Sequence, residues 1–558
     1  MACAIPLTKN TMYFLENPVL QRELLVNLRT GRSFLLLASY QLLLAIVVVV
    51  AWPADERLDL STSPASARRL VDLFFLGQYV IASLMAPSFA AGAVTGEKER
   101  MTYELLLATP LRPVAIVIGK MVASLTHLAM IIAGSLPIIV LCLPLGGLSF
   151  YEVLAAYLGL IVSVILFGAI GIACSSYFRR TSSSLVVSYL IILPLVMLAI
   201  GFWRGMEGDG ALRLKLTVLV IPAFALTAVV LLCGNAAGRM LYPPDVGSEG
   251  KDVVDLEKEN AQAVGLVINR DQFPDRLFAP PKKQSLMPDG ANPVYDKEIH
   301  SEIFSQGTLM LRLVIQISML LALPLMAWLL FISSDKSPWF VVFVIVFNML
   351  VGPVFLAGGI CGERERQTLD LLLTSTITPG QILWGKLLVG LRVSCVLTGF
   401  LLWPLLLASI FVESFWSNWL SVLLMFLIVL VVCVANGVIA LFCSAMARKT
   451  SVALLGTYTI ILGLYALPIS AMSMLALLQP EMLARESWIQ WSTVTSPFAA
   501  LFALPLDASL NGGTGEEPVN VGNLRLVFAY FAFTLITIGG LLGLTIHRLK
   551  DRTVLVGD

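Results

Sequence analysis

The chain has 558 residues, of which 58% are hydrophobic and 13% charged, with a net charge of +1 and a mean hydropathy of +0.87. A soluble core of this length could not bury so much apolar surface, so the composition excludes a water-soluble globular protein and indicates a membrane protein. The small net charge and the dispersed basic residues give no sign of nucleic-acid binding.

An internal duplication organises the chain. Residues 96–120 read GEKERMTYELLLATPLRPVAIVIGK, and residues 362–386 read GERERQTLDLLLTSTITPGQILWGK. Two further pairs of segments occur in the same order, 17–23 with 292–298 and 174–182 with 443–451. The offsets are 266 (96 to 362), 275 (17 to 292) and 269 (174 to 443), so one register holds with small insertions.

Apolar stretches long enough to cross a bilayer occur throughout both copies. A membrane-spanning helix needs about 20 apolar residues, because its backbone groups must pair within the segment. The predicted spans are 34–52, 70–95, 114–145, 151–178, 182–203, 214–237, 308–332, 338–361, 383–411, 418–446, 451–475 and 525–547. The expected fold is therefore an all-α polytopic membrane protein with about 12 transmembrane helices, arranged as two homologous six-helix bundles.

Basic residues in the loops predict the orientation. With the N-terminus in the cytoplasm, that side collects about 26 Lys and Arg against about 9 outside. Because the number of spans is even, both termini are predicted to be cytoplasmic, in a multi-pass protein of the cytoplasmic (inner) membrane. Both copies of the repeated motif then face the cytoplasm, between the second and third spans of each half.

A short amphipathic helix is predicted before the first span of each half, over 17–29 and 292–304. Asn17 and Asn292 are placed to cap these helices, and a proline follows each at the first helical position. Such a helix lies flat on the membrane, either as an anchor or as a platform for a cytoplasmic partner. The expected apolar stripes are Leu20, Leu24 and Leu28 in the first copy and Tyr295, Ile299 and Ile303 in the second, where Asp296, Lys297, Glu298 and Glu302 face water.

The repeated motif is predicted to form a short helix across the mouth of two spans. In the first copy Gly96 ends the apolar span, Thr102 is a good N-cap residue and Glu104 falls in the first turn, where the helix dipole favours a carboxylate. Leucines follow, expected to face the bundle, and Pro113 ends the helix; Pro379 does so in the second copy. The competing interpretation is a re-entry loop whose charges keep it out of lipid. The candidate docking residues are Glu97, Glu99, Arg100, Thr102 and Glu104, with Glu363, Glu365, Arg366, Thr368 and Asp370 in the second copy.

Three segments outside the spans are long. The first, 53–69, is an exterior loop, and the second, 239–291, is rich in proline and charge and is predicted to be a cytoplasmic linker. The predicted domains are thus 1–238 and 292–558, joined by that linker. The third segment, 476–524, is exterior and contains tryptophans, which favour the membrane interface, so part of it is expected to be re-entrant or to lie on the surface.

The motif resembles that of the ABC-2 type permeases, the membrane subunits of a class of ATP-binding cassette transporters. Their pattern after the second span is close to G-E-x-E-x-x-T-x-[ED]-x-L-L-x-[TS]-x followed by Gly-Lys, which this sequence carries twice and ends with Gly119-Lys120 and Gly385-Lys386. The resemblance implies that 17–29 and 292–304 are interface helices and that the motifs are coupling helices, which sit in clefts of ATPase subunits. The usual Thr-Pro after the leucines is Thr109-Pro110 here but Ser375-Thr376 in the second copy.

The resemblance also implies a division of labour. The sequence contains no G-x-x-x-x-G-K-[ST] loop to hold ATP phosphates, so the chain is not expected to be an enzyme or to bind a cofactor. ATP and Mg are expected in separate cytoplasmic ATPase subunits, two per chain. Their closure would rock one half against the other, and the chain would export an amphipathic or hydrophobic substrate that the sequence does not identify.

Two other classes of protein remain open at this point. A secondary transporter is often a duplicated 12-span chain, but such carriers commonly use carboxylates within the membrane, and the predicted spans have none well inside. His127 and Arg392 are the deeper ionisable residues and are weak candidates for the substrate path. A membrane scaffold that transports nothing is the third class. The eight cysteines have no spacing that suits a disulfide framework or a metal site.

Overall fold

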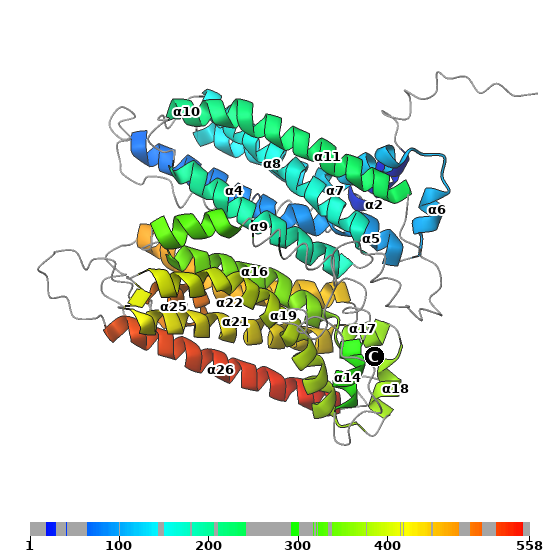
Figure 1. Cartoon of the computed structure of the whole chain (residues 1–558), viewed down its shortest axis with the longest axis vertical. Coiled ribbons are helices and arrows are strands. Elements are labelled where there is room, and N and C mark those ends of the chain that lie inside the picture. The colour runs from blue at the N-terminus through cyan, green and yellow to red at the C-terminus, as the bar shows by residue number, and fades with distance from the viewer. Residues whose placement is uncertain are drawn as a thin grey trace, which may run out of the picture. The chain divides into compact units, whose positions relative to one another are not determined.

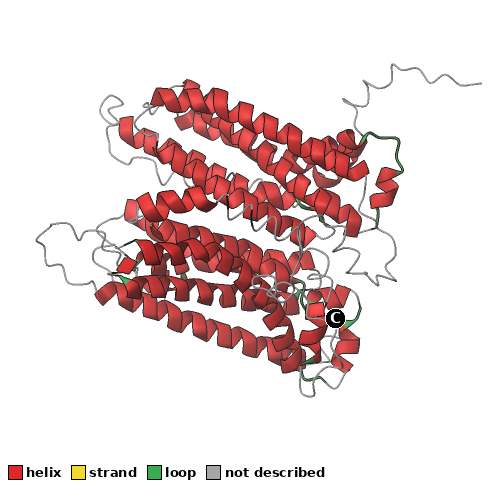
Figure 2. Cartoon of the chain, viewed as in Figure 1, coloured by secondary structure: helices red, strands yellow, loops and turns green. Residues whose placement is uncertain are grey.

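A computed structural model gives the structure of the chain. It describes residues 18–28, 41, 64–99, 101–142, 150–178, 181–205, 210–241, 292–300, 316, 320, 322–332, 337–365, 367–374, 377–412, 415–416, 418–447, 450–478, 491–504 and 521–550. Helices make up nearly all of this part, and no strand occurs in it (Figure 2). The chain divides into two compact units, Met1–Val246 and Gly247–Asp558. The predicted boundaries of the linker stay a prediction, because residues 242–291 lie outside the described residues.

Unit 1 is built around one central span, α8. Its helices are α2 (Pro18–Leu28), α4 (Pro64–Ala90), α5 (Gly92–Glu99), α6 (Tyr103–Leu107), α7 (Pro113–Cys142), α8 (Phe150–Tyr177), α9 (Thr181–Gly205), α10 (Gly210–Lys215), η3 (Leu216–Val220) and α11 (Ile221–Leu241). The span α8 packs against α4, α7, α9 and α11, and its residues from Phe167 to Ser176 are all buried. Figure 1 shows α2, α5 and α6 gathered at one end of this bundle, which we call the motif end of unit 1.

Unit 2 repeats this plan around α21. Its helices are α14 (Pro293–His300), η4 (Ala327–Ile332), α16 (Ser337–Ala357), α17 (Cys361–Glu365), α18 (Leu369–Thr374), α19 (Pro379–Phe411), α21 (Trp419–Met446), α22 (Thr450–Leu478), η6 (Thr493–Thr495), α25 (Pro497–Phe502) and α26 (Val521–Lys550). The span α21 packs against α16, α19, α22 and α26. The motif end of unit 2 carries α14, α17 and α18 (Figure 1).

Ten of the twelve predicted spans are confirmed as helices. In the described part of the chain, nine helices are long and apolar enough to cross a membrane, and a tenth, α7, passes the same test with a bend of 42°. The prediction for 34–52 falls outside the described residues except for Gln41. The prediction for 308–332 is described mainly at its end, as a short apolar helix over Ala322–Ile332.

A proline inside a span frees a backbone carbonyl, and for Pro468 a neighbouring helix supplies the donor. Pro468 removes the N–H that would bond to the Leu464 carbonyl four residues earlier, and the Thr495 hydroxyl donates to that carbonyl at 2.8 Å. Thr495 belongs to 476–524, the segment expected to be exterior. Beyond it α25 packs into the bundle: Ala500 and Leu501 are fully buried, and the helix packs against α16, α21, α22 and α26. The re-entrant or surface position expected for this segment stays a prediction.

Candidate functional site

A break in the span precedes each motif, and a serine from the central span stabilises the break. In unit 1, α4 stops at Ala90 and α5 restarts at Gly92. The Ser175 hydroxyl of α8 accepts hydrogen bonds from the backbone N–H groups of Val94 and Thr95, each at 2.9 Å. N–H groups near a helix start lack partners in their own helix, so this serine caps α5 from outside.

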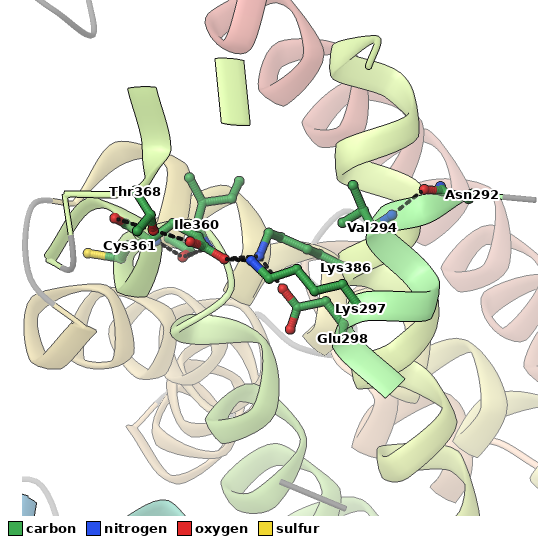
Figure 3. Close-up of polar contacts among 10 residues, drawn as sticks. Asn292, Val294, Lys297, Glu298, Ile360, Cys361, Thr368 and Lys386 are labelled. Carbon is green, nitrogen blue, oxygen red and sulfur yellow. Dashed lines mark hydrogen bonds and ion pairs between the residues drawn. The ribbon is translucent and has the colours of Figure 1, made fainter. Parts of the chain in front are cut away.

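Unit 2 has the same arrangement (Figure 3). Ser444 of α21, at the position equivalent to Ser175, accepts from the backbone N–H groups of Ile360 and Cys361, each at 3.0 Å. The predicted end of the span at the motif glycine is therefore wrong in both copies. The helices run through Gly96 to Glu99 and through Gly362 to Glu365, because each is capped at its start and keeps its own backbone hydrogen bonds.

A cation from each motif satisfies the carbonyls at the end of the central span. Lys98 Nζ donates to three carbonyls at the end of α8, those of Ser175 at 3.2 Å, Ser176 at 2.7 Å and Phe178 at 2.9 Å. In unit 2 the guanidinium of Arg364 donates to the carbonyls of Ala447 at 2.7 Å and Ala445 at 3.3 Å. The last carbonyls of a helix are unpaired and carry partial negative charge, so a cation there stabilises the helix end.

A buried lysine joins the motif to the amphipathic helix in unit 1. Lys120 of α7 is 3% exposed, and its Nζ lies 3.2 Å from Glu23 Oε1 of α2 and 3.1 Å from Glu97 Oε1 of α5. We call Lys120, Glu23 and Glu97 the first lysine clamp. A buried ammonium is costly without charged partners, so the two carboxylates hold α2 and α5 on the same point of α7.

The second lysine clamp has the same geometry. Lys386 of α19 is 4% exposed, and its Nζ lies 2.5 Å from Glu298 Oε1 of α14 and 3.3 Å from Glu363 Oε1 of α17. Lys297, which is 61% exposed, adds an ion pair with Glu363 at 3.2 Å. Figure 3 shows the two lysines converging from α14 and α19. Glu298, which the sequence predicted to face water, is thus turned inward by Lys386.

The packing of α14 differs from its predicted stripe. Val294 is the buried residue, at 3% exposed, whereas Tyr295 is half-buried and Ile299 and Ile303 lie outside the residues whose side chains are described. A Cβ at Gly385 would lie 3.0 Å from both Val294 Cβ and Tyr295 N. Glycine therefore permits the close approach of α14 to α19 that brings Glu298 to Lys386. The predicted cap is confirmed, since Asn292 Oδ1 accepts from Val294 N at 3.0 Å; Asn17 lies outside the described residues.

The motif threonines do not cap the short helices as predicted. Thr102 Oγ1 donates to the Glu97 carboxylate, and its N–H donates to the Glu97 carbonyl at 3.0 Å. Thr368 makes the same two bonds to Glu363, with 2.9 Å for the backbone bond. The carboxylate of the clamp competes successfully for the hydroxyl because it is charged. The turn is closed by a left-handed residue in each unit, Met101 with φ 56° and Gln367 with φ 57°.

Glu99 and Glu365 cap the next span. Glu99 Oε1 accepts from the first backbone N–H of α9, that of Thr181, at 2.7 Å. Glu365 accepts from the N–H of Thr450 at 2.9 Å and from its hydroxyl at 2.8 Å. Both glutamates therefore stabilise a helix N-terminus within their own unit.

The outward face of the motif is carried by the short helices α6 and α18. Tyr103 anchors α6: its ring is buried beneath Lys98 Nζ, 5.6 Å away, and burial raises the pKa of its hydroxyl. Glu104 lies in the first turn of α6 as predicted and is exposed. Leu105 is 70% exposed and its equivalent Leu371 is 72% exposed, so the first leucine of each triplet faces outward, contrary to the prediction.

The other candidate residues are placed less fully. Arg100 and Arg366 lie outside the described residues, as do the side chains of Asp370 and His127. Arg392 is half-buried on α19. Pro113 and Pro379 do not end the short helices as predicted; each is the first residue of the following span, where a missing N–H costs nothing.

Sequence reasoning singled out neither clamp lysine as a site residue. The signal was available, because Gly-Lys recurs in both copies at the start of an apolar span. A charged residue at such a position calls for a partner. The identity of that partner, on a helix 97 residues away in unit 1 and 88 residues away in unit 2, is set by tertiary packing.

Comparison with protein families agrees with this duplicated geometry. Two family models match, over residues 57–238 and 211–553, and both are described as ABC-2 family transporter protein. The second covers more than half of the chain. The chain belongs to the ABC-2 family of transporter proteins. None of the curated proteins compared with it matches. This ABC-2 protein is thus a multi-pass membrane subunit of an ABC transporter, from families of non-catalytic membrane components.

Proposed function

We propose that this ABC-2 protein is the permease of an exporter driven by two separate cytoplasmic ATPase subunits, which supply ATP and Mg. The protein lies in the inner membrane, with both termini and both motif ends in the cytoplasm. The substrate is amphipathic or hydrophobic. Family membership argues against the secondary transporter.

The observation that carries the proposal is the outward face of α6 and α18. A leucine more than two-thirds exposed stands at the same place in both units, although other parts of each motif are tied down by Lys98, Arg364 and the lysine clamps. One exposed leucine is common on a protein surface, so the support comes from its recurrence at the same place in both copies of the motif. Leu105 and Leu371 would be the contact residues, with Glu104 beside the first.

This assignment changes the roles of the candidate residues. Glu97, Glu99 and Thr102, with Glu363, Glu365 and Thr368, bond to partners within their own units and hold the docking helices in place. In the proposed cycle the ATPase subunits close on ATP and pull α6 and α18. The clamps would make α2 and α14 move with the motifs, because breaking a buried ion pair is strongly unfavourable.

The test is co-purification with measurement of coupled ATP hydrolysis. The full chain is isolated in mild detergent from its own cells, and the retained ATPase is identified by mass spectrometry and assayed in nanodiscs. We expect Leu105→Asp and Leu371→Asp to lower retention of the ATPase, and the double variant to lower it at least about tenfold. The matched control is Gln21→Asp, which adds the same charge at an exposed residue of α2, where the second copy already has Asp296.

Retention unchanged in the double variant would contradict the docking role. An ATPase that is retained, but whose turnover ignores both the chain and added lipid-like substrates, would favour the scaffold. Transport of a labelled lipid out of inverted or right-side-out vesicles then decides its direction.

A further inference from the structure

The interior of unit 2 contains a hydrogen-bonded network that joins four spans. Asn348 Nδ2 of α16 donates to Ser394 Oγ at 3.0 Å and to Thr398 Oγ1 at 2.9 Å, both on α19. Asn436 Nδ2 of α21 donates to Asn348 Oδ1 at 2.9 Å, and the Tyr465 hydroxyl of α22 donates to Asn436 Oδ1 at 3.1 Å. We call these five residues the polar core of unit 2.

The polar core is buried in the middle of its spans. Each of its residues is at most 3% exposed. Side-chain hydrogen bonds between helices replace water where none is present, so these contacts hold the helices in one register. The amides and hydroxyls bond to one another and therefore serve packing. Asn348 and Asn436 are thus interhelical partners, not groups poised for a ligand.

Unit 1 has only apolar residues at the equivalent positions. In the register of the duplication, the counterparts are Ala82, Leu128, Ile132, Phe167 and Val196. All five are buried, at 5% exposed or less. Apolar side chains in a membrane protein gain no hydrophobic energy over lipid and fix no hydrogen-bond direction. The five positions of the polar core therefore contribute packing but no hydrogen bonds in unit 1.

In the described part of unit 1, hydrogen bonds between these spans occur only as separate contacts near this depth. The Tyr189 hydroxyl of α9 donates to the Leu84 carbonyl of α4 at 2.7 Å, a bond that unit 2 repeats from Tyr458 to Leu350 at 2.6 Å. Ser135 of α7 shares a hydrogen bond with Tyr157 of α8 at 2.9 Å.

The polar core continues to the residues that precede α25. The Tyr465 carbonyl accepts from Ser496 Oγ at 2.6 Å, one residue beyond the bond from Thr495 to the carbonyl freed by Pro468. Ser496 immediately precedes α25. A continuous chain of contacts thus runs from α25 through α22 and α21 to α16 and α19.

We infer that the polar core makes unit 2 the rigid half of this duplicated protein, with α16, α19, α21 and α22 opening as one body, while the equivalent spans of unit 1 open more readily and separately. The inference concerns stability within each unit and does not depend on the ATPase, the direction or the substrate proposed above.

Hydrogen exchange measured by mass spectrometry on the full chain in nanodiscs tests it. We expect the central amides of α16, α19 and α21 to exchange at least about tenfold more slowly than those of α4, α7 and α8. Thr398→Val keeps the shape of the side chain but removes the acceptor for Asn348. It should raise exchange in α16 as well as α19. Tyr465→Phe, also nearly isosteric, should raise exchange in α21 as well as α22.

The matched control is Thr545→Val on α26. Thr545 is 1% exposed, and its hydroxyl donates to the Leu541 carbonyl of its own helix at 2.6 Å. The rise in hydrogen exchange caused by Thr545→Val should stay within α26. Equal protection of the two sets of spans in the unaltered chain would overturn the inference, and so would effects of Thr398→Val and Tyr465→Phe that stay on the mutated helix. Asn436→Leu is the severe variant; if it does not fold, the two isosteric variants still decide.

Discussion

The two motif ends reach one geometry with partly different side chains. Lys98 satisfies the end of α8, whereas Arg364 satisfies the end of α21. The buried cation of the clamp is lysine in both, Lys120 and Lys386. A helix end accepts any cation that can reach its carbonyls, while the clamp holds a compact ammonium between two carboxylates. The end of the central span is thus satisfied by lysine in one unit and arginine in the other, whereas both clamps use lysine.

A second difference concerns how many cations hold each motif carboxylate. Glu363 pairs with both Lys386 and Lys297. Glu97 pairs with Lys120. The charge of Arg22, at the position equivalent to Lys297, also favours the ionised Glu97 carboxylate, but Arg22 forms no ion pair with Glu97 among the described residues. The second clamp therefore has a second direct partner for its motif glutamate, and the first clamp depends more on its buried lysine.

The largest expected loss of stability comes from removing the buried lysine of a clamp. Lys120→Ala leaves Glu23 and Glu97 close together without their cation and should lower the free energy of unfolding by about 3–5 kcal/mol. Lys386→Ala should cost less, because Lys297 remains beside Glu363. Thermal unfolding in detergent, followed by fluorescence, measures both. A larger loss for Lys386→Ala would show that the exposed lysine gives no reserve.

The next effect concerns the serines that cap the breaks. Ser175→Ala and Ser444→Ala each leave two buried N–H groups without the hydroxyl acceptor, at about 1–3 kcal/mol per variant. The two losses should be equal if the breaks are equivalent. Ser188→Ala is the control, since Ser188 is buried and its hydroxyl donates to the Ser184 carbonyl of its own helix at 2.7 Å. Stability losses no larger than that of Ser188→Ala would contradict the capping role of Ser175 and Ser444.

A smaller effect is expected at the glutamates that cap the following spans. Glu99→Ala and Glu365→Ala should each lower stability by about 1 kcal/mol. Glu365 should cost slightly more, because it also accepts from the Thr450 hydroxyl. Both losses should shrink at high salt, since both side chains are exposed. Unfolding curves at low and high ionic strength check this, and losses independent of salt would count against charge as the cause.

The smallest effect on stability is expected at the docking helices. Leu105→Ala and Leu371→Ala remove side chains that are already mostly exposed, so the free energy of unfolding should change by less than about 0.5 kcal/mol. Stimulation of the partner ATPase should nevertheless fall in both. A fall in only one variant would show that the two motifs are not used equally, which their difference at Thr109-Pro110 and Ser375-Thr376 already suggests.

Much of the fold was readable from apolar length and repetition. Ten spans were predicted within a few residues, because a bilayer requires a long apolar helix wherever the chain crosses. The helix start at Pro293 was also local, since asparagine and proline fix it by capping and by φ. The buried face of α14 could not be predicted from local sequence, because Gly385 on another helix decides that Val294 packs inward.

The sequence located the candidate site as a segment, but some of the predicted side-chain contacts within it were wrong. Its recurrence in register indicated function, and Glu104 falls in the first turn as expected. Thr102 was assigned to the helix beside it, yet its hydroxyl is bonded to Glu97. Local sequence shows which residues could cap a helix, but a charged acceptor brought close by the turn at Met101 competes for the same hydroxyl.

The sequence by itself determined that this protein is a duplicated bundle of membrane helices with one charged motif in each half, because span length and repeated order are properties of the chain alone. The tertiary structure decided which motif residues face inward. A buried lysine attracts whichever carboxylates packing brings within reach, and Glu23 and Glu97 meet only where three helices converge on Lys120.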